Sequence, residues 1–144
     1  MRVIYLIGPY RSDTEYGVHR NIQEAERQAA EIWRLGAFCF CPHKNTAYLG
    51  GVVPDETFLQ GDLEFMRRCD AVYVGENADR SLGGQAELAE ARHIGLPIIW
   101  SMAGVYHWVR GEPAPPCEAP ATPGSAYVPM KCSKPIAVLP GEGI

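Results

Sequence analysis

Residues 70–94 decide the fold of this chain and read DAVYVGENADRSLGGQAELAEARHI. The apolar run 71–74 has the pattern of a short buried strand, polar loop residues and then Ser81-Leu82-Gly83-Gly84 follow it, and a helical pattern begins after Gly84. In an open parallel sheet, the loop after a strand binds ligands, and the next helix offers free backbone N–H groups. The stretch therefore predicts a strand, a ligand loop and a helix that carries Glu87 in its first turn.

Glu87 is the acidic residue of this helix that we expect to face a ligand. It shares a helical face with Ala91 and Ile94, four and seven residues later, so its carboxylate should point along the partly buried side. The alternative is a surface residue that balances the helix dipole, which is common for glutamate in a first turn.

Length and charge restrict the class of protein. A chain of 144 residues predicts one domain, residues 1–144, with a single sheet covered by helices on both faces. Thirteen basic and 17 acidic residues give a net charge of −4, which excludes a broad basic surface for a nucleic-acid polymer or an anionic membrane. Without an apolar run of roughly 20 residues or a signal-peptide pattern, we expect a cytoplasmic protein with no membrane partner.

The five cysteines suggest reduced thiols rather than a disulfide framework. The spacing Cys39-x-Cys41-x-His43 on a strand would place three metal ligands on one face, which leaves a metal or redox protein as an alternative. Buried cysteines that pack as small apolar side chains are the simpler interpretation. We expect neither a metal nor an organic cofactor.

The first 46 residues predict a right-handed β-α-β unit. An apolar strand at 2–7 leads into Gly8-Pro9-Tyr10-Arg11, where Gly8 allows close approach to a ligand and Arg11 offers donors for a phosphate or carboxylate. The helix from about residue 19 to residue 35 and the strand 37–41 complete the unit. Its helix has apolar residues in a helical period at Ile22, Ala25, Ala29, Ile32 and Trp33.

A polar cluster at 42–46 should lie in a loop at the same rim. His43 and Asn45 could contact a base or a ribose hydroxyl there, or could only cap the loop. A second helix begins near Pro54 and continues to residue 69, and Asp62 lies four residues after Phe58, on the apolar side.

A fourth strand within 95–100 and helical turns at 105–110 follow, and residues 112–144 form a proline-rich extension of uncertain structure with an edge strand at 134–139. The pattern predicts an α/β fold, a Rossmann-like three-layer sandwich with a central, mainly parallel sheet of about five strands.

Three groups of residues together resemble the nucleoside 2-deoxyribosyltransferase superfamily. They are Tyr5 with Gly8-Pro9-Tyr10-Arg11, Asp62-Leu63 eight residues before the strand that starts at Asp70, and Ser81-x-Gly83-x-x-x-Glu87. The superfamily includes deoxyribosyltransferases and nucleoside 5′-monophosphate N-glycosidases, and the resemblance covers about residues 1 to 100.

The resemblance implies a role for each matching residue. Glu87 would be the nucleophile that forms a covalent glycosyl-enzyme, Asp62 the acid that assists the departing base, and Tyr5 the residue that orients the glutamate. The expected substrate-binding residues are Gly8, Pro9, Tyr10, Arg11, His43, Asn45, Ser81, Gly83 and Gly84. The chemistry agrees, because a carboxylate stabilises an oxocarbenium-like state while a second acid assists the leaving group.

The substrate is then a small nucleoside or nucleotide, and the resemblance also implies a homodimer or larger homo-oligomer. Arg80 beside Ser81, with Arg11 on the opposite loop, suits a phosphate better than a free 5′-hydroxyl, so we favour a hydrolase of nucleoside monophosphates. The alternatives are a deoxyribosyltransferase, which moves deoxyribose between bases, and a non-catalytic nucleotide-binding module. The proline-rich extension departs from the family pattern.

Overall fold

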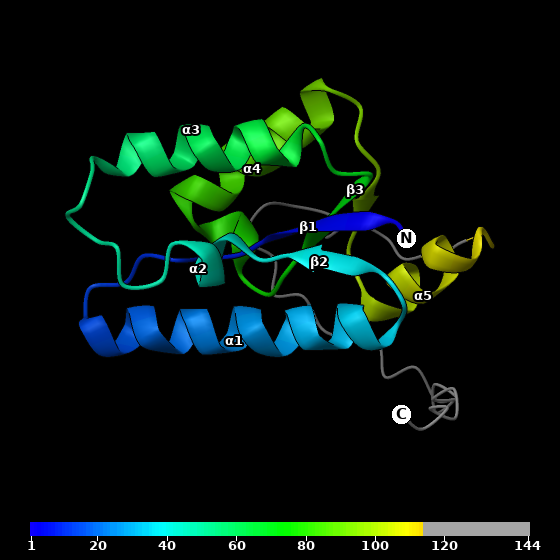
Figure 1. The fold of residues 1–144 in the computed structure, drawn as a ribbon, viewed down its shortest axis with the longest axis horizontal. Helices are drawn as coiled ribbons and strands as arrows, with labels where there is room; N and C mark the ends of the chain where they lie inside the picture. Colours follow the sequence, from blue (N-terminus) through cyan, green and yellow to red (C-terminus); the bar gives the residue numbers. More distant parts are fainter. Residues whose placement is uncertain (114–144) are drawn as a thin grey trace.

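The computed structural model describes residues 1–113 of the chain, and these form a three-layer α/β structure (Figure 1). Within them lies a parallel sheet of four strands in the order β2-β1-β3-β4. The strands are β1 (Val3–Ile7), β2 (Phe38–Phe40), β3 (Ala71–Val74) and β4 (Ile98–Ile99). The helices are α1 (Glu15–Arg34), α2 (Pro42–Asn45), α3 (Asp55–Met66), the 3-10 turn η1 (Ala78–Arg80), α4 (Leu82–His93) and α5 (Met102–Arg110).

Strand β1 lies in the centre and divides the core into two halves. Its side chains alternate, so Ile4 and Leu6 pack against α1 and α5 while Tyr5 and Ile7 pack against α3 and α4. Figure 1 shows the same arrangement, with α3 and α4 above the sheet and α1 below it. The predicted α/β class and Rossmann-like parallel sheet are confirmed, and the expected strand at 134–139 lies outside the described residues.

Helix α1 begins earlier than its apolar pattern indicated. Thr14 caps it by accepting a hydrogen bond from the Gly17 N–H at 3.0 Å, and Gly36, with φ of +93°, ends it. The expected place of Trp33 in the buried stripe was wrong. Its side chain is 46% exposed and contacts the Phe38 ring edge-on, because it lies one position beyond the face that carries Ile32.

Residues 42–46 were expected to be a loop, but Pro42–Asn45 form the single helical turn α2. Proline at the first position fits, since its ring presets the helical φ angle and its missing N–H is not needed there. Strand β2 is correspondingly shorter than expected, and this turn carries His43 to the carboxyl end of the sheet.

Helix α4 corrects the expected position of Glu87. The helix begins at Leu82, capped by Ser81, so Glu87 is its sixth residue and lies in the second turn rather than the first. The dipole therefore acts on Glu87 less directly than predicted, because its effect is concentrated in the first turn. No helix within residues 1–113 is long and apolar enough to cross a membrane.

Candidate active site

The site lies where the direction of the chain along the sheet reverses. From β1 the chain passes through α1 to β2 on one side, and it returns through α3 to β3 on the other. The loops after β1 and β3 diverge at this point, which is where ligands bind in open α/β sheets. A pocket of about 780 Å³ lies between these loops, α2, α3 and the start of α4.

At the inner end of the pocket, Glu87 lines the wall and the buried Tyr5 lies behind it. The Tyr5 side chain is fully buried on β1, and its hydroxyl donates a hydrogen bond of 2.5 Å to Oε1 of Glu87. Glu87 is 6% exposed and lines the pocket from α4. The ring of Tyr5 stacks at 5.7 Å on Phe40, which stacks at 3.9 Å on Phe65, so three elements hold the tyrosine in place.

Burial determines the protonation of this pair. It raises the pKa of Glu87 to about 8, the Tyr5 hydrogen bond acts in the opposite direction, and the Asp62 carboxyl adds a further rise. Burial and then the Glu87 charge raise the pKa of Tyr5 above its ordinary value, so its hydroxyl keeps the proton that it donates.

Asp62 faces the same pocket from α3. Its side chain is half-buried beside the apolar pocket residues Phe58 and Leu59, and this burial raises its pKa to about 6. Glu64, two residues later, is exposed and pairs with arginines at the surface. The structure thus brings two carboxyl groups with different surroundings, Asp62 and Glu87, to one cavity.

The start of α4 offers backbone donors to the pocket. The Ser81 hydroxyl accepts from the Gly84 N–H at 3.0 Å and donates to the Ala78 carbonyl at 3.2 Å, so it serves the helix cap. The N–H groups of Leu82 and Gly83 come first in the helix and have no acceptor within it. A Cβ on Gly83 would meet nothing within 4 Å, whereas one on Gly84 would lie 2.2 Å from the Ala78 carbonyl oxygen.

His43 supports the loop after β1 from behind. Its Nε2 hydrogen-bonds the Pro9 carbonyl at 3.1 Å, and because a carbonyl only accepts, Nε2 carries the proton. Burial lowers the pKa of His43, so the ring is neutral, and its buried Nδ1 has no partner among the described residues. Gly8 lies against the ring, where a Cβ would be 3.1 Å from Cε1.

Arg11 and Asp55 form an ion pair at the mouth of the pocket. The pair joins the loop after β1 to the first residue of α3. Asn21 of α1 holds the same loop, since its Nδ2 donates to the carbonyls of Tyr10 at 3.1 Å and Arg11 at 3.3 Å. Neither Asn21 nor Asp55 could be predicted as a site residue, because no local pattern distinguishes them from other polar helix residues.

Most of the expected site residues lie together. The pocket lining includes Gly8, Pro9, Tyr10, Arg11, His43, Asp62, Ser81, Gly83 and Glu87. Tyr5 lies behind Glu87, and Gly84 packs against η1. Asn45 does not line the pocket, because its place on α2 turns it toward solvent.

The possible metal ligands Cys39, Cys41 and His43 do not form a metal site in the described residues. Within residues 1–113, no three His, Cys, Asp or Glu side chains form a group that could hold a metal ion. Cys39 and Cys41 are buried, and burial raises the pKa of both thiols, which keeps them protonated.

Comparison with solved structures reveals a similar fold in an enzyme. The 2-deoxyribosyltransferase of the psychrotolerant bacterium Bacillus psychrosaccharolyticus matches with a TM-score of 0.51 and 22% sequence identity, over 67% of this chain and 69% of that chain. At this identity the likeness concerns the fold. No curated protein matches the sequence. A family model described as a domain of unknown function, DUF7768, matches residues 2–101, and the chain belongs to this family.

Proposed function

We propose that the protein cleaves the N-glycosidic bond of a nucleoside 5′-monophosphate or nucleoside through a covalent glycosyl-enzyme on Glu87. The observation that carries this proposal is the buried Glu87 carboxyl, held by the Tyr5 hydroxyl at 2.5 Å, in a pocket that Asp62 also lines. A buried carboxyl with an orienting donor and a second acid is the set of groups that retaining glycoside cleavage requires.

In the proposed reaction Tyr5 binds Oε1 of Glu87, which leaves Oε2 to attack the anomeric carbon. The new bond joins this carbon to Glu87, the carbon–nitrogen bond to the base breaks, and the base departs with the proton of Asp62. In the second step Asp62 accepts a proton from water, and the oxygen of that water displaces Glu87. The free base and the sugar are the products.

The two carboxyl groups suit this cycle because they share one proton near neutral pH. With pKa values of about 6 for Asp62 and about 8 for Glu87, the pair holds a single proton between these limits. In the resting pair this proton lies mainly on Glu87, which has the higher pKa. The reactive form is the less populated one, in which the proton has moved to Asp62, and the departing base takes it from Asp62 as the ionised Glu87 attacks.

Several groups favour a phosphorylated substrate. Arg11 and Arg80 line the mouth of the pocket, and the free N–H groups of Leu82 and Gly83 can bind phosphate oxygens. Because the Ser81 hydroxyl serves the helix cap, backbone donors rather than this hydroxyl would bind the phosphate. We also propose a cytoplasmic protein that acts as a homodimer or larger homo-oligomer.

The second candidate is a nucleoside 2-deoxyribosyltransferase, in which another base replaces water. The fold of the Bacillus psychrosaccharolyticus enzyme favours it, and the same two carboxyls would serve. A non-catalytic nucleotide-binding module is a third candidate. Two desolvated carboxyls argue against it, because their burial is costly and a binding module gains nothing from it.

The test is base release, followed by chromatography, from nucleosides and 5′-monophosphates in ribo and deoxy forms, with and without an acceptor base. Wild-type protein is compared with Glu87→Ala and with Glu76→Ala, which removes an exposed carboxyl outside the lining of this pocket. Release from monophosphates without acceptor, lost only in Glu87→Ala, supports the hydrolase. Release that needs an acceptor supports the transferase. Ligand binding without release by any variant would refute both.

A further inference from the structure

The two carboxyls of the site belong to different helices, so their separation depends on how α3 packs against α4. Asp62 lies on α3 and Glu87 on α4. Of the described residues of α3, Met66 alone is fully buried, and it lies at the end of the helix. Leu63 and Phe65 also pack against the core, so apolar contacts anchor the last turn of α3, beyond Asp62, and a polar contact at that same end can help to fix the angle between the two helices.

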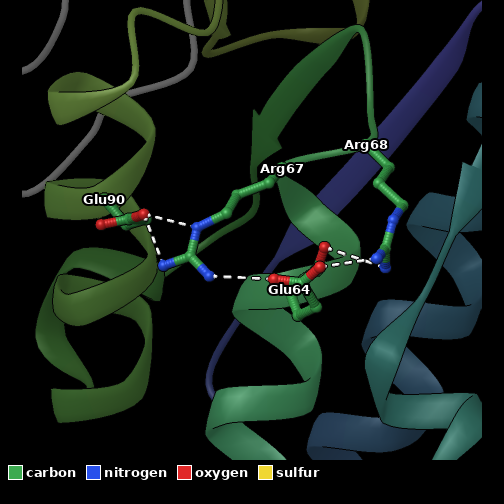
Figure 2. Close-up of polar contacts among 4 residues, drawn as sticks. All are labelled: Glu64, Arg67, Arg68 and Glu90. Atoms are coloured by element: carbon green, nitrogen blue, oxygen red, sulfur yellow. Dashed lines mark hydrogen bonds and ion pairs between the residues drawn. The ribbon is translucent and has the colours of Figure 1, made fainter.

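Arg67, the residue after α3, makes the polar link between these helices (Figure 2). Its Nε and Nη2 donate to Oε1 of Glu90 on α4 at 2.8 and 2.7 Å, and its Nη1 lies 3.3 Å from Oε2 of Glu64. Glu90 is only 21% exposed on its side chain, so one end of the link is shielded from water. The planar guanidinium holds both acidic groups in one geometry.

This link lies close to the carboxyl pair. Glu90 follows Glu87 by three residues, or about 4.5 Å along the axis of α4. We propose that Arg67 is a positioning residue which, by joining the end of α3 to Glu90, sets the separation of the Asp62 and Glu87 carboxyls. The catalytic meaning of this role rests on the proposed function.

The titratable groups around Glu87 come from β1, from α3 and from the segment after α3. Tyr5 on β1 donates a hydrogen bond to Glu87, Asp62 faces Glu87 from α3, and Cys69, three residues beyond the end of α3, lies near Tyr5. Without the Arg67 link, α3 can turn away from α4 and admit water to Asp62. Hydration favours the charged carboxylate, so the pKa of Asp62 should fall, and that of Glu87 should fall with it.

The direction in which the two pKa values change distinguishes a loss of helix geometry from a simple loss of charge. Loss of the guanidinium charge alone would raise the pKa of nearby carboxyls, whereas loss of the helix geometry lowers it. Carboxyl carbon NMR titrations of Arg67→Ala should show the Asp62 pKa lower than its wild-type value by about 1 unit, and a smaller fall for Glu87. Arg67→Lys keeps a charge that can reach Glu90 and should retain most of the wild-type values.

Arg68→Ala is the matched control. Arg68 carries the same charge one residue later, but its described polar partners are groups of Glu64 on α3, the helix that it follows, and not of α4. Arg68→Ala should therefore leave the pKa values of Asp62 and Glu87 unchanged. Arg67→Met removes the link but keeps an apolar stem of similar length and every acidic group, so it should reproduce the fall, which keeps the test valid if Arg67→Ala does not fold.

The proposal is overturned if Arg67→Ala and Arg67→Met keep the wild-type pKa values of Asp62 and Glu87, raise them, or change them no more than Arg68→Ala does. The titration needs no substrate, so it is independent of the proposed reaction. For a substrate found by the base-release panel, kcat/KM of Arg67→Ala should fall by about 10- to 100-fold, as a displaced catalytic pair implies. It should remain near wild type in Arg68→Ala.

Discussion

Replacement of Glu87 by glutamine should stabilise the protein at neutral pH while it abolishes the proposed activity. In the folded protein burial raises the pKa of Glu87 from 4.5 to about 8. The folded state therefore binds this proton more tightly than the unfolded state does. The associated stability is complete below the ordinary pKa and is lost as the pH rises toward 8. Glutamine stays neutral throughout and can still accept the Tyr5 hydrogen bond.

The size of the effect follows from the same values. Over the window in which only the unfolded state loses the proton, the free energy of unfolding falls by up to about 1.4 kcal/mol per pH unit. Between pH 5 and pH 7 the advantage of Glu87→Gln over wild type should grow by roughly 2–3 kcal/mol. For a chain of this size that is a further rise in relative Tm of roughly 5–10 °C.

The assay is thermal and urea unfolding of both proteins at pH 5, 6 and 7, with Glu76→Gln as the control for loss of an exposed carboxyl. The control should follow the wild-type curve. Parallel curves for wild type and Glu87→Gln would refute the reasoning, because they would mean that the Glu87 carboxyl is as well hydrated in the folded state as in the unfolded one.

Further predictions concern the same pocket. Tyr5→Phe removes the donor at 2.5 Å, so the pKa of Glu87, measured by NMR, should rise by about 1 unit and kcat/KM should fall, and an unchanged pKa would contradict the assigned bond. The pH profile of kcat/KM should be bell-shaped with limbs near 6 and 8 from Asp62 and Glu87, and a flat profile between pH 5 and 9 would exclude the pair. Gly84→Ala should lower the free energy of unfolding by about 2 kcal/mol or more, because its Cβ would meet a carbonyl oxygen, whereas Gly83→Ala has open space and should raise it by about 0.5–1 kcal/mol in urea unfolding. Equal effects of the two alanines would count against the close packing of η1 on α4.

The sheet could be predicted because its strands have strong local signals. The run Ala71–Val74 is apolar on both faces, as a central parallel strand must be, and the structure has the strand at those residues. Side chains alternate along β1, so neighbouring residues of this strand pack into opposite halves of the core. The inward direction of Asp62 followed from helical spacing, since it does not depend on where the helix begins.

The errors arose where a helix boundary depends on contacts that periodicity does not report. Ser81 caps α4 through its hydroxyl, which moves the start of the helix toward it and moves Glu87 into the second turn. Pro42 starts a helical turn that could not be predicted, because the polar residues after it have the composition of a loop. The same turn explains why Asn45 does not line the pocket as expected, because the helical backbone directs its side chain away from the pocket. The ion pair of Arg11 with Asp55 joins residues far apart in sequence, and a local pattern cannot predict it.

The position of β1 in the sheet also has a consequence for the order of folding. Strands β1 and β2 with α1 form a continuous unit in the first forty residues, whereas Tyr5 and Glu87 are 82 residues apart. Contacts between such distant residues form late, because the intervening chain must first be ordered. We therefore expect a folding chain to complete its β-α-β unit while Glu87 is still hydrated and ionised. The desolvated carboxyl would then arise late, when α4 docks on the sheet and Glu87 takes up the proton that the native pocket holds.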